Sequence, residues 1–255
     1  MKNYIERLKA NCPTRRFIFW WIFRLLMIYA FVAGFFQEPF DITNPLQVGA
    51  NFVCMFLWEI FMLFPEKNCL RHVSSAMQTF LIMGIFAASF GGKFLNLYYD
   101  FRWWDVILHT IGGGACVFFG YEICTAAQKR DKVYVPMTII MLCSLGFTFL
   151  ACTGWELFEF TFDQISCKAA AAAGDITKAG DAQHWSRVLA EGTPKSLTLF
   201  DPCFEDRWAL MDTMADTVLN TVGAAVAFVF IKIYPYRHKG KYRYTEIPDG
   251  AHPAL

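Results

Sequence analysis

The sequence predicts an all-α integral membrane protein with six transmembrane helices, and three observations support this fold class. Of the 255 residues, 56% are hydrophobic and only 18% are charged, whereas soluble domains carry about 25% charged residues. The mean hydropathy is positive, at +0.33. Apolar runs of about 20 residues, the length that spans a bilayer, recur along the chain.

The first part of the chain predicts a helix at the membrane surface followed by the first span. Residues 1–16 are basic, and Tyr4, Ile5 and Leu8 recur at helical spacing, as in an amphipathic helix that lies in the interface. The apolar run at 17–36 is longer than the core of a signal peptide. We therefore interpret this run as a retained transmembrane helix.

Five more apolar runs complete the predicted bundle. Prolines, Asp100 and the charged QKRDK turn at 128–132 separate them, because such residues do not continue an apolar helix. The predicted spans cover residues 47–64, 74–98, 103–127, 133–162 and 210–234. The long connection at 163–209 contains CKAAAAAGD and GTPK, and we expect it to be mostly irregular.

Basic residues in the short connections predict the orientation of the bundle. Lys and Arg concentrate in the N-terminal segment, in the second and fourth connections and in the tail, which lie on one side of a six-span bundle. Since cytoplasmic loops carry the excess of Lys and Arg, both termini are expected in the cytoplasm. The predicted parts are a basic segment at 1–16, a transmembrane domain at 17–234 with its extracytoplasmic loop at 163–209, and a cytoplasmic tail at 235–255.

Charge and cysteine usage exclude some classes of protein. A net charge of +1 without a basic stripe argues against nucleic acid as a partner. The nine cysteines show neither CxxC pairs nor the spacing of a disulfide framework. A disulfide between Cys167 and Cys203, which are both predicted outside, would fasten the long loop over the bundle, and the sequence leaves this pairing open.

Three predicted spans carry polar residues where lipid would penalise them. They are Asp105 and His109 on the fourth span, Glu156 and Glu159 on the fifth, and Asp212, Asp216 and Asn220 on the sixth. Charged side chains in a membrane normally face a bundle interior or a watery cavity. The predicted topology places all three groups at one depth, in the outer third of the membrane. We therefore expect them to form one site.

Small residues follow the same helical faces as these polar groups. The stripes are Gly113, Cys116 and Gly120 on the fourth span, Ser144, Thr148 and Cys152 on the fifth, and Gly223 and Ala227 on the sixth. Small residues let transmembrane helices approach closely. The last three spans are therefore expected to pack against one another.

The residue types at this site favour a divalent metal, with zinc, manganese and magnesium as candidates. Imidazole and carboxylate are the ligands that such ions prefer. The expected ligands are His109, Glu156, Glu159, Asp212 and Asp216. Catalytic roles are expected for Asp105, His109, Glu156 and Glu159, with Asp105 as a further ligand or as the group that orients the imidazole. Asn220, Lys93 and Asn96 are expected to support the ligands or to contact a phosphate.

Other interpretations of these residues stay open. Each charged side chain could reach water separately by snorkelling, which applies to Lys93 and Asn96 in particular. The carboxylates could also handle protons without a metal. In the inner halves of the first two spans, Arg24 and Glu59 are expected to form a structural ion pair.

Three segments of the chain resemble known families. DVILHTIGGG, GWELFEFTFD and MDTMADTVLNTVGA resemble the YjdF-like family of uncharacterised bacterial inner-membrane proteins. A looser likeness links Asp105, His109, Glu156, Asp216, Asn220 and Gly223 to VanZ-like proteins, although Glu159 stands where those carry glutamine and the long loop departs from their pattern. The resemblance implies a helical fold, the same polar site and residence in the bacterial inner membrane, and it leaves the reaction open.

The first functional hypothesis is a metal-dependent membrane enzyme that acts on a lipid or cell-envelope substrate by hydrolysis or group transfer. The second is a proton- or cation-coupled transporter, although transporters usually place their site near the midplane. The third is a non-catalytic protein that binds a lipid or a partner protein. Membrane lipids are expected partners in all three.

Overall fold

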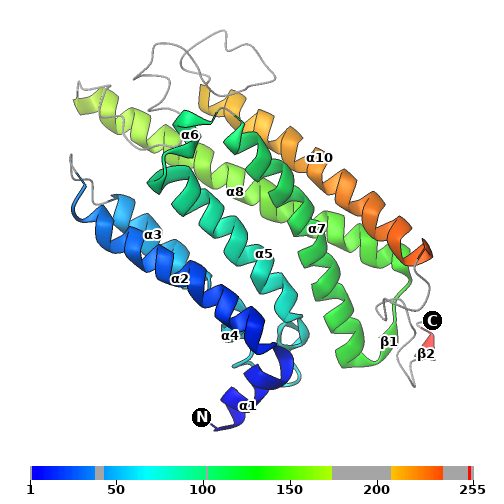
Figure 1. Ribbon diagram of the computed structural model, residues 1–255. Coiled ribbons are helices and arrows are strands. Elements are labelled where there is room, and N and C mark those ends of the chain that lie inside the picture. The colour runs from blue at the N-terminus through cyan, green and yellow to red at the C-terminus, as the bar shows by residue number, and fades with distance from the viewer. Residues whose placement is uncertain (1, 38–42, 102, 174–207, 238–251, 254–255) are drawn as a thin grey trace.

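The computed structural model describes residues 2–37, 43–101, 103–173, 208–237 and 252–253 (Figure 1). Its elements are α1 (Lys2–Asn11), α2 (Thr14–Gly34), α3 (Thr43–Cys54), α4 (Leu57–Phe61), η1 (Cys69–His72), α5 (Ser75–Phe86), η2 (Ala87–Phe94), α6 (Leu97–Asp100), α7 (Trp104–Asp131), β1 (Val133–Tyr134), α8 (Met137–Ala173), α10 (Trp208–Arg237) and β2 (His252–Pro253). The predicted all-helical architecture is confirmed. The strands β1 and β2 form a two-residue parallel pair beside the helices.

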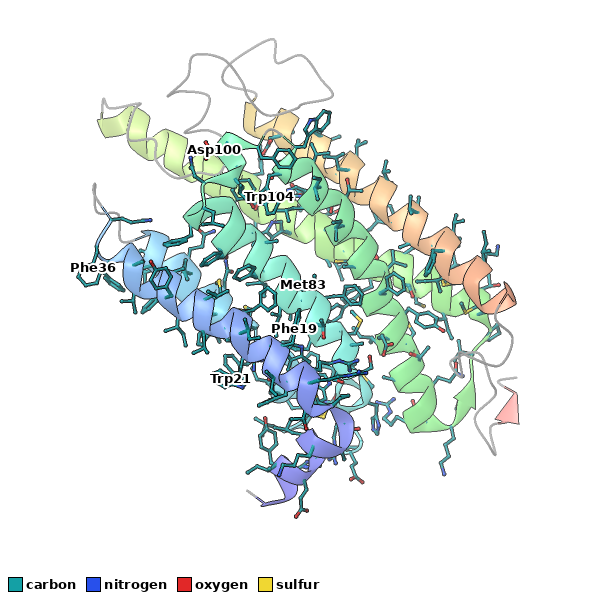
Figure 2. All side chains as sticks on the ribbon, viewed as in Figure 1. Phe19, Trp21, Phe36, Met83, Asp100 and Trp104 are labelled. Carbon is teal, nitrogen blue, oxygen red and sulfur yellow. The ribbon has the colours of Figure 1, made fainter. Side chains whose placement is uncertain are left out.

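Five helices in the described part of the chain are long and apolar enough to cross a membrane. They cover Thr14–Gly34, Ser75–Phe94, Trp104–Gln128, Met137–Thr161 and Asp212–Ile233. Large apolar side chains on these helices point outward, and Figure 2 shows Trp21 and Phe36 directed away from the bundle. Because exposed apolar surface of this extent is unfavourable in water, the fold is that of a membrane protein.

The expected second span at 47–64 differs from the prediction, because it is divided into α3 and α4. The interruption falls at Met55 and Phe56, where the sequence has neither proline nor glycine. Arg24 Nη2 and Gln78 Nε2 both donate to the carbonyl oxygen of Met55. Side chains that bind a backbone carbonyl in this way compete with the helical hydrogen bonds and break the helix.

The third span also departs from a regular α-helix. After α5 it continues as the π-helix η2, in which the N–H of Leu95 donates to the carbonyl of Phe90 at 2.8 Å. A Cβ at Gly91 would meet the Trp104 ring at 2.8 Å, so glycine lets η2 approach the start of α7. Asn96 then adopts a left-handed conformation with φ 62° and ends the span.

The helix that contains the fifth span begins and ends later than predicted. α8 begins at Met137, just after Pro136, which suits the first turn of a helix. It continues to Ala173, so residues 163–173 are helical where an irregular loop was expected. The alanine run in KAAAAA accounts for this, since alanine has the highest helix propensity. The side chain of Cys167 and all of Cys203 lie outside the described residues, so the structure says nothing of a disulfide between them.

α7, α8 and α10 pack together, and α5 lies between this group and α2 (Figure 1). A Cβ at Gly113 would collide with the Asn220 carbonyl, and one at Gly223 would collide with the Thr110 carbonyl. At Gly120, a Cβ would lie 2.7 Å from the Cα of Ser144. The predicted close approach of the last three long helices is therefore confirmed, and it brings the backbones that carry the polar residues together.

Candidate functional site

The candidate site is a cluster of polar side chains on α7, α8 and α10. The members that these helices bring together are Asp105, His109, Glu156, Glu159, Asp216 and Asn220. On each helix the residues stand one turn apart, so each helix presents its polar groups from one face. All of them lie near the same end of the three spanning segments.

His109 is the centre of the cluster. Its Nδ1 lies 3.2 Å from Glu156 Oε1, and its Nε2 lies 3.5 Å from Asp216 Oδ2. The same Nε2 lies 3.6 Å from Asp105 Oδ1, one turn earlier on α7. One imidazole therefore faces a carboxylate from each of three helices.

Asn220 connects the imidazole to the deepest carboxylate. Its Nδ2 donates to Glu156 Oε1 at 3.1 Å and lies 3.3 Å from His109 Nδ1. Asn220 is buried on α10, one turn beyond Asp216. It therefore holds both Glu156 and His109 in place, and its supporting role in a metal or catalytic site stays a prediction.

The cluster is buried on one side and open on the other. The side chains of Glu156 and Asp216 are 2% and 3% exposed, whereas those of Asp105 and His109 are 15% and 14% exposed. The edge formed by α7 is thus the accessible one.

Two overlapping groups of side chains could hold a metal ion. One comprises Asp105, His109 and Asp216, and the other comprises His109, Glu156 and Glu159, with ligand atoms within 4.8 Å of one another in each group. Nitrogen and carboxylate oxygen suit zinc and manganese, and the oxygens suit magnesium. In addition, Asp216 Oδ2 is buried without a hydrogen-bond partner. An unsatisfied buried carboxylate oxygen fits the coordination of a cation.

Three expected members of the site have other surroundings. Asp212 is buried on α10 one turn before Asp216, and neither ligand group includes it. Lys93 Nζ donates to Gln47 Oε1 at 2.5 Å, and Asn96 Nδ2 lies 3.5 Å from Asp100 Oδ1. The roles of these three residues near the cluster remain predictions.

A second buried polar group lies on the N-terminal helices. Arg24 Nη2 contacts Glu59 Oε1 at 2.6 Å, so the expected ion pair is confirmed. The guanidinium also lies 3.8 Å above the Phe56 ring centre. Sequence reasoning missed Gln78, which accepts a hydrogen bond from the Trp58 N–H at 2.9 Å. Its isolated position in the apolar stretch MQTFLIMG was the available signal.

Comparisons with known proteins agree with the membrane fold and the resemblance. The family described as "Predicted membrane protein (DUF2238)" matches residues 18–237. A Thermotoga maritima protein described as "Uncharacterized protein" is 32% identical over 102 residues, which cover 39% of this chain and 50% of that protein. No solved structure matches.

The match to the family extends from the first spanning helix to the end of α10, so it includes every residue of the cluster. The predicted membership of an uncharacterised membrane-protein family is confirmed, while the looser likeness to VanZ-like proteins stays a prediction. The chain belongs to the DUF2238 family of predicted membrane proteins.

Proposed function

We propose that the cluster around His109 is a divalent-metal site of a membrane enzyme. Its substrate would be a lipid or a component of the cell envelope, cleaved or transferred at a phosphate or ester. One observation carries this proposal: a single imidazole lies within 3.2–3.6 Å of carboxylates from three helices, and one buried carboxylate oxygen among them has no hydrogen-bond partner.

The charge of the cluster favours a cation. Its acidic members are Asp105, Glu156, Glu159 and Asp216, and carboxylates brought so close together repel one another. A divalent ion held by His109 with Glu156, Glu159 or Asp216 would offset this repulsion. It would also act as a Lewis acid on a phosphate or ester oxygen.

The side chains at the open edge are the candidates for proton transfer. Asp105 lies at the exposed rim and contacts His109 Nε2, so it can orient the imidazole or accept a proton from an attacking water molecule. Glu159 is less buried than Glu156 and stands one turn nearer the end of the span. Glu156, which is held by Asn220, is better suited to binding the ion.

The proposed setting is the bacterial inner membrane with both termini in the cytoplasm. The broken pair α3 and α4 would then form a sixth crossing, in addition to the five long helices. In this arrangement the cluster faces the outer leaflet. An extracytoplasmic lipid headgroup would meet it at the α7 edge.

The first experiment is metal analysis of the purified full-length protein. We expect bound zinc or manganese, or binding of Mn²⁺ or Mg²⁺ after chelation, and we expect Asp216→Asn and His109→Gln to weaken binding at least tenfold. Glu122→Gln is the matched control, because Glu122 is a part-buried carboxylate at the other end of α7. If the wild type binds none of these ions, or if Glu122→Gln weakens binding as much as Asp216→Asn, the metal proposal is wrong.

One observation favours a second function, a proton- or cation-coupled transporter. Interrupted helices are common at transporter sites, and the second predicted span is interrupted beside the buried pair Arg24 and Glu59. Uptake of Mn²⁺ or protons into proteoliposomes tests this function. Flux abolished by Asp216→Asn would favour transport over hydrolysis. If the protein binds metal but shows neither ion flux nor catalytic turnover, the result would favour a non-catalytic protein that binds a lipid or a partner protein.

A further inference from the structure

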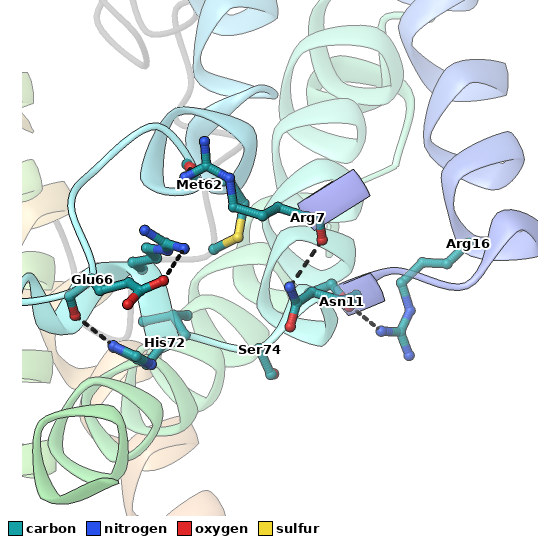
Figure 3. Close-up of a pocket in the computed structure, with 10 residues that line it drawn as sticks. Arg7, Asn11, Arg16, Met62, Glu66, His72 and Ser74 are labelled. Carbon is teal, nitrogen blue, oxygen red and sulfur yellow. Dashed lines mark hydrogen bonds and ion pairs between the residues drawn. The ribbon is translucent and has the colours of Figure 1, made fainter. Parts of the chain in front are cut away.

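We infer that a basic cavity at the N-terminal end of the bundle binds the phosphate of an anionic phospholipid headgroup. The cavity has a volume of about 530 Å³ and is lined by side chains that include Arg7, Arg16, Arg71, His72, Asn11 and Ser74 (Figure 3). Pockets of about 300–1,000 Å³ accommodate small ligands. A phospholipid headgroup is within this range.

Five separate segments supply the lining of this basic cavity, and one of them is the stretch after α4 that carries Met62 and Glu66. Arg7 comes from α1, Arg16 from the start of α2, Arg71 and His72 from η1, and Ser74 from the residue before α5. The positive charges are thus collected from elements far apart in the sequence. Since α2 and α5 are spanning helices that both begin here, the cavity lies at the depth of the headgroups.

The charge balance of the cavity is positive. Among the described residues that line it, three arginines outnumber one carboxylate, that of Glu66, which bonds Arg71 at 3.0 Å. The Glu66 side chain is 82% exposed, whereas that of Arg71 is only 16% exposed, so water screens the carboxylate more than the guanidinium. Among the described residues Arg16 forms no ion pair, and it donates to the neutral Ser75 Oγ at 2.6 Å.

Groups other than the arginines also suit an anion. Ser74 Oγ is buried without a hydrogen-bond partner and lies at the N-cap of α5. The N-terminus of α5 adds the positive end of a helix dipole, which favours phosphate. The Ser74 N–H donates a hydrogen bond to Glu122 Oε2 at 3.3 Å. The hydroxyl group, rather than this N–H, is therefore the donor that a ligand would use.

Guanidinium groups point to phosphate in particular, because their planar donors match phosphate oxygens in bidentate pairs. A free phosphate ion offers the same oxygens. The position at the ends of two spans favours the lipid, because basic pockets between spanning helices on the cytoplasmic side bind anionic headgroups. This inference is independent of the metal site, since His109 and Glu122 are separated along α7 by roughly 20 Å at 1.5 Å per residue.

The test compares probes on full-length protein in lipid nanodiscs. Phosphatidylglycerol is expected to raise the unfolding temperature of the wild type above its value in phosphatidylcholine at equal lipid content. Arg16→Gln with Arg71→Gln should lower the affinity for phosphatidylglycerol at least tenfold. Arg130→Gln is the matched control, because Arg130 is a solvent-exposed arginine at the same end of the bundle, bonded to the Lys67 carbonyl, and it should leave the affinity unchanged.

Three results would overturn the inference. They are equal stability in the two lipids, an undiminished phosphatidylglycerol effect in the double variant, or equal stabilisation by millimolar inorganic phosphate in phosphatidylcholine discs. If the double variant does not fold, Arg71→Gln alone and Arg16→Lys replace it. Arg16→Lys keeps the charge but loses the planar fork, so weaker phosphatidylglycerol binding is still expected and unchanged binding by both variants counts against the site.

Discussion

Two buried polar groups in this bundle differ in their balance of positive and negative charge. The Arg24–Glu59 pair joins one cation to one anion at 2.6 Å, and Gln78 and the Met55 carbonyl complete its surroundings. The cluster around His109 gathers carboxylates from α7, α8 and α10 against a single imidazole. The first group is neutral within the protein, and the second is not.

This difference in charge fits a structural role for the first group and the proposed functional role for the second. A neutral ion pair between helices needs no further component, and it accounts for the interruption of the second predicted span. An excess of negative charge in a buried site is unfavourable unless protons or a cation offset it. The cluster therefore needs protons or a cation to offset its charge, and the Arg24 pair does not.

The largest effect is expected from breaking the Arg24–Glu59 pair. Arg24→Met leaves the Glu59 carboxylate buried without its cation, and removing one partner of a buried pair costs about 3–5 kcal/mol. The Phe56 ring also loses its cation at 3.8 Å. Unfolding in detergent, followed by a thiol-reactive dye or by circular dichroism, measures the loss.

Two controls sharpen this result. Arg24→Met combined with Glu59→Leu should recover most of the stability, because Arg24 Nε, Arg24 Nη1 and Glu59 Oε2 are buried without hydrogen bonds in the wild type. Asp131→Asn removes an exposed ion pair with Arg130, and no measurable change is expected. A loss in the double variant as large as in Arg24→Met would mean that the pair is not what stabilises this region.

Sequence reasoning predicted the cluster well because depth and helical face can both be derived from one chain. Apolar run lengths place His109, Glu156 and Asp216 at one level, and the stripes of small residues identify the facing sides. The close approach at Gly113 and Gly223 confirms those faces. Features that depend on one helix and its ends could therefore be predicted from the sequence.

Features that depend on contacts between distant segments could not be predicted from the sequence. The break at Met55 and Phe56 is caused by Arg24 and Gln78 from other helices. No residue near the break predicts it from the sequence. The basic cavity has the same origin, since Arg16 and Arg71 indicate only membrane orientation until α2 and η1 are placed side by side.

A smaller effect is expected from separating the helices that carry the cluster. A methyl group at Gly113 or Gly223 meets the backbone carbonyl of Asn220 or Thr110, so α7 and α10 must move apart. Overpacking of this kind costs about 1–3 kcal/mol. Because Asn220 and His109 would shift, metal affinity should fall as well, while the Arg24 pair should be unaffected.

Glycines on α8 provide the control for this substitution. A Cβ at Gly146 or Gly154 meets nothing within 4 Å, so Gly146→Ala and Gly154→Ala should leave stability and metal affinity unchanged or slightly improved. The measurements are unfolding in detergent and titration with Mn²⁺. Equal losses at Gly113 and Gly154 would show that the approach of α7 to α10 does not determine the outcome, because alanine itself favours a helix more than glycine does.

The smallest expected effect is a gain in stability rather than a loss. It tests most directly the difference in charge between the Arg24–Glu59 pair and the cluster around His109. Without metal, Asp216→Asn removes the charge of one of the mutually repelling carboxylates, so stability should rise by about 0.5–2 kcal/mol. With saturating Mn²⁺ the order should reverse, because only the wild type gains the stabilisation that ligand binding gives to the folded state. Unfolding of both proteins in chelator and in Mn²⁺ measures the two differences, with Asn220→Asp, which adds a carboxylate, expected to be less stable than wild type in chelator. A loss of stability for Asp216→Asn in chelator would show that its carboxylate, like Arg24, serves the fold.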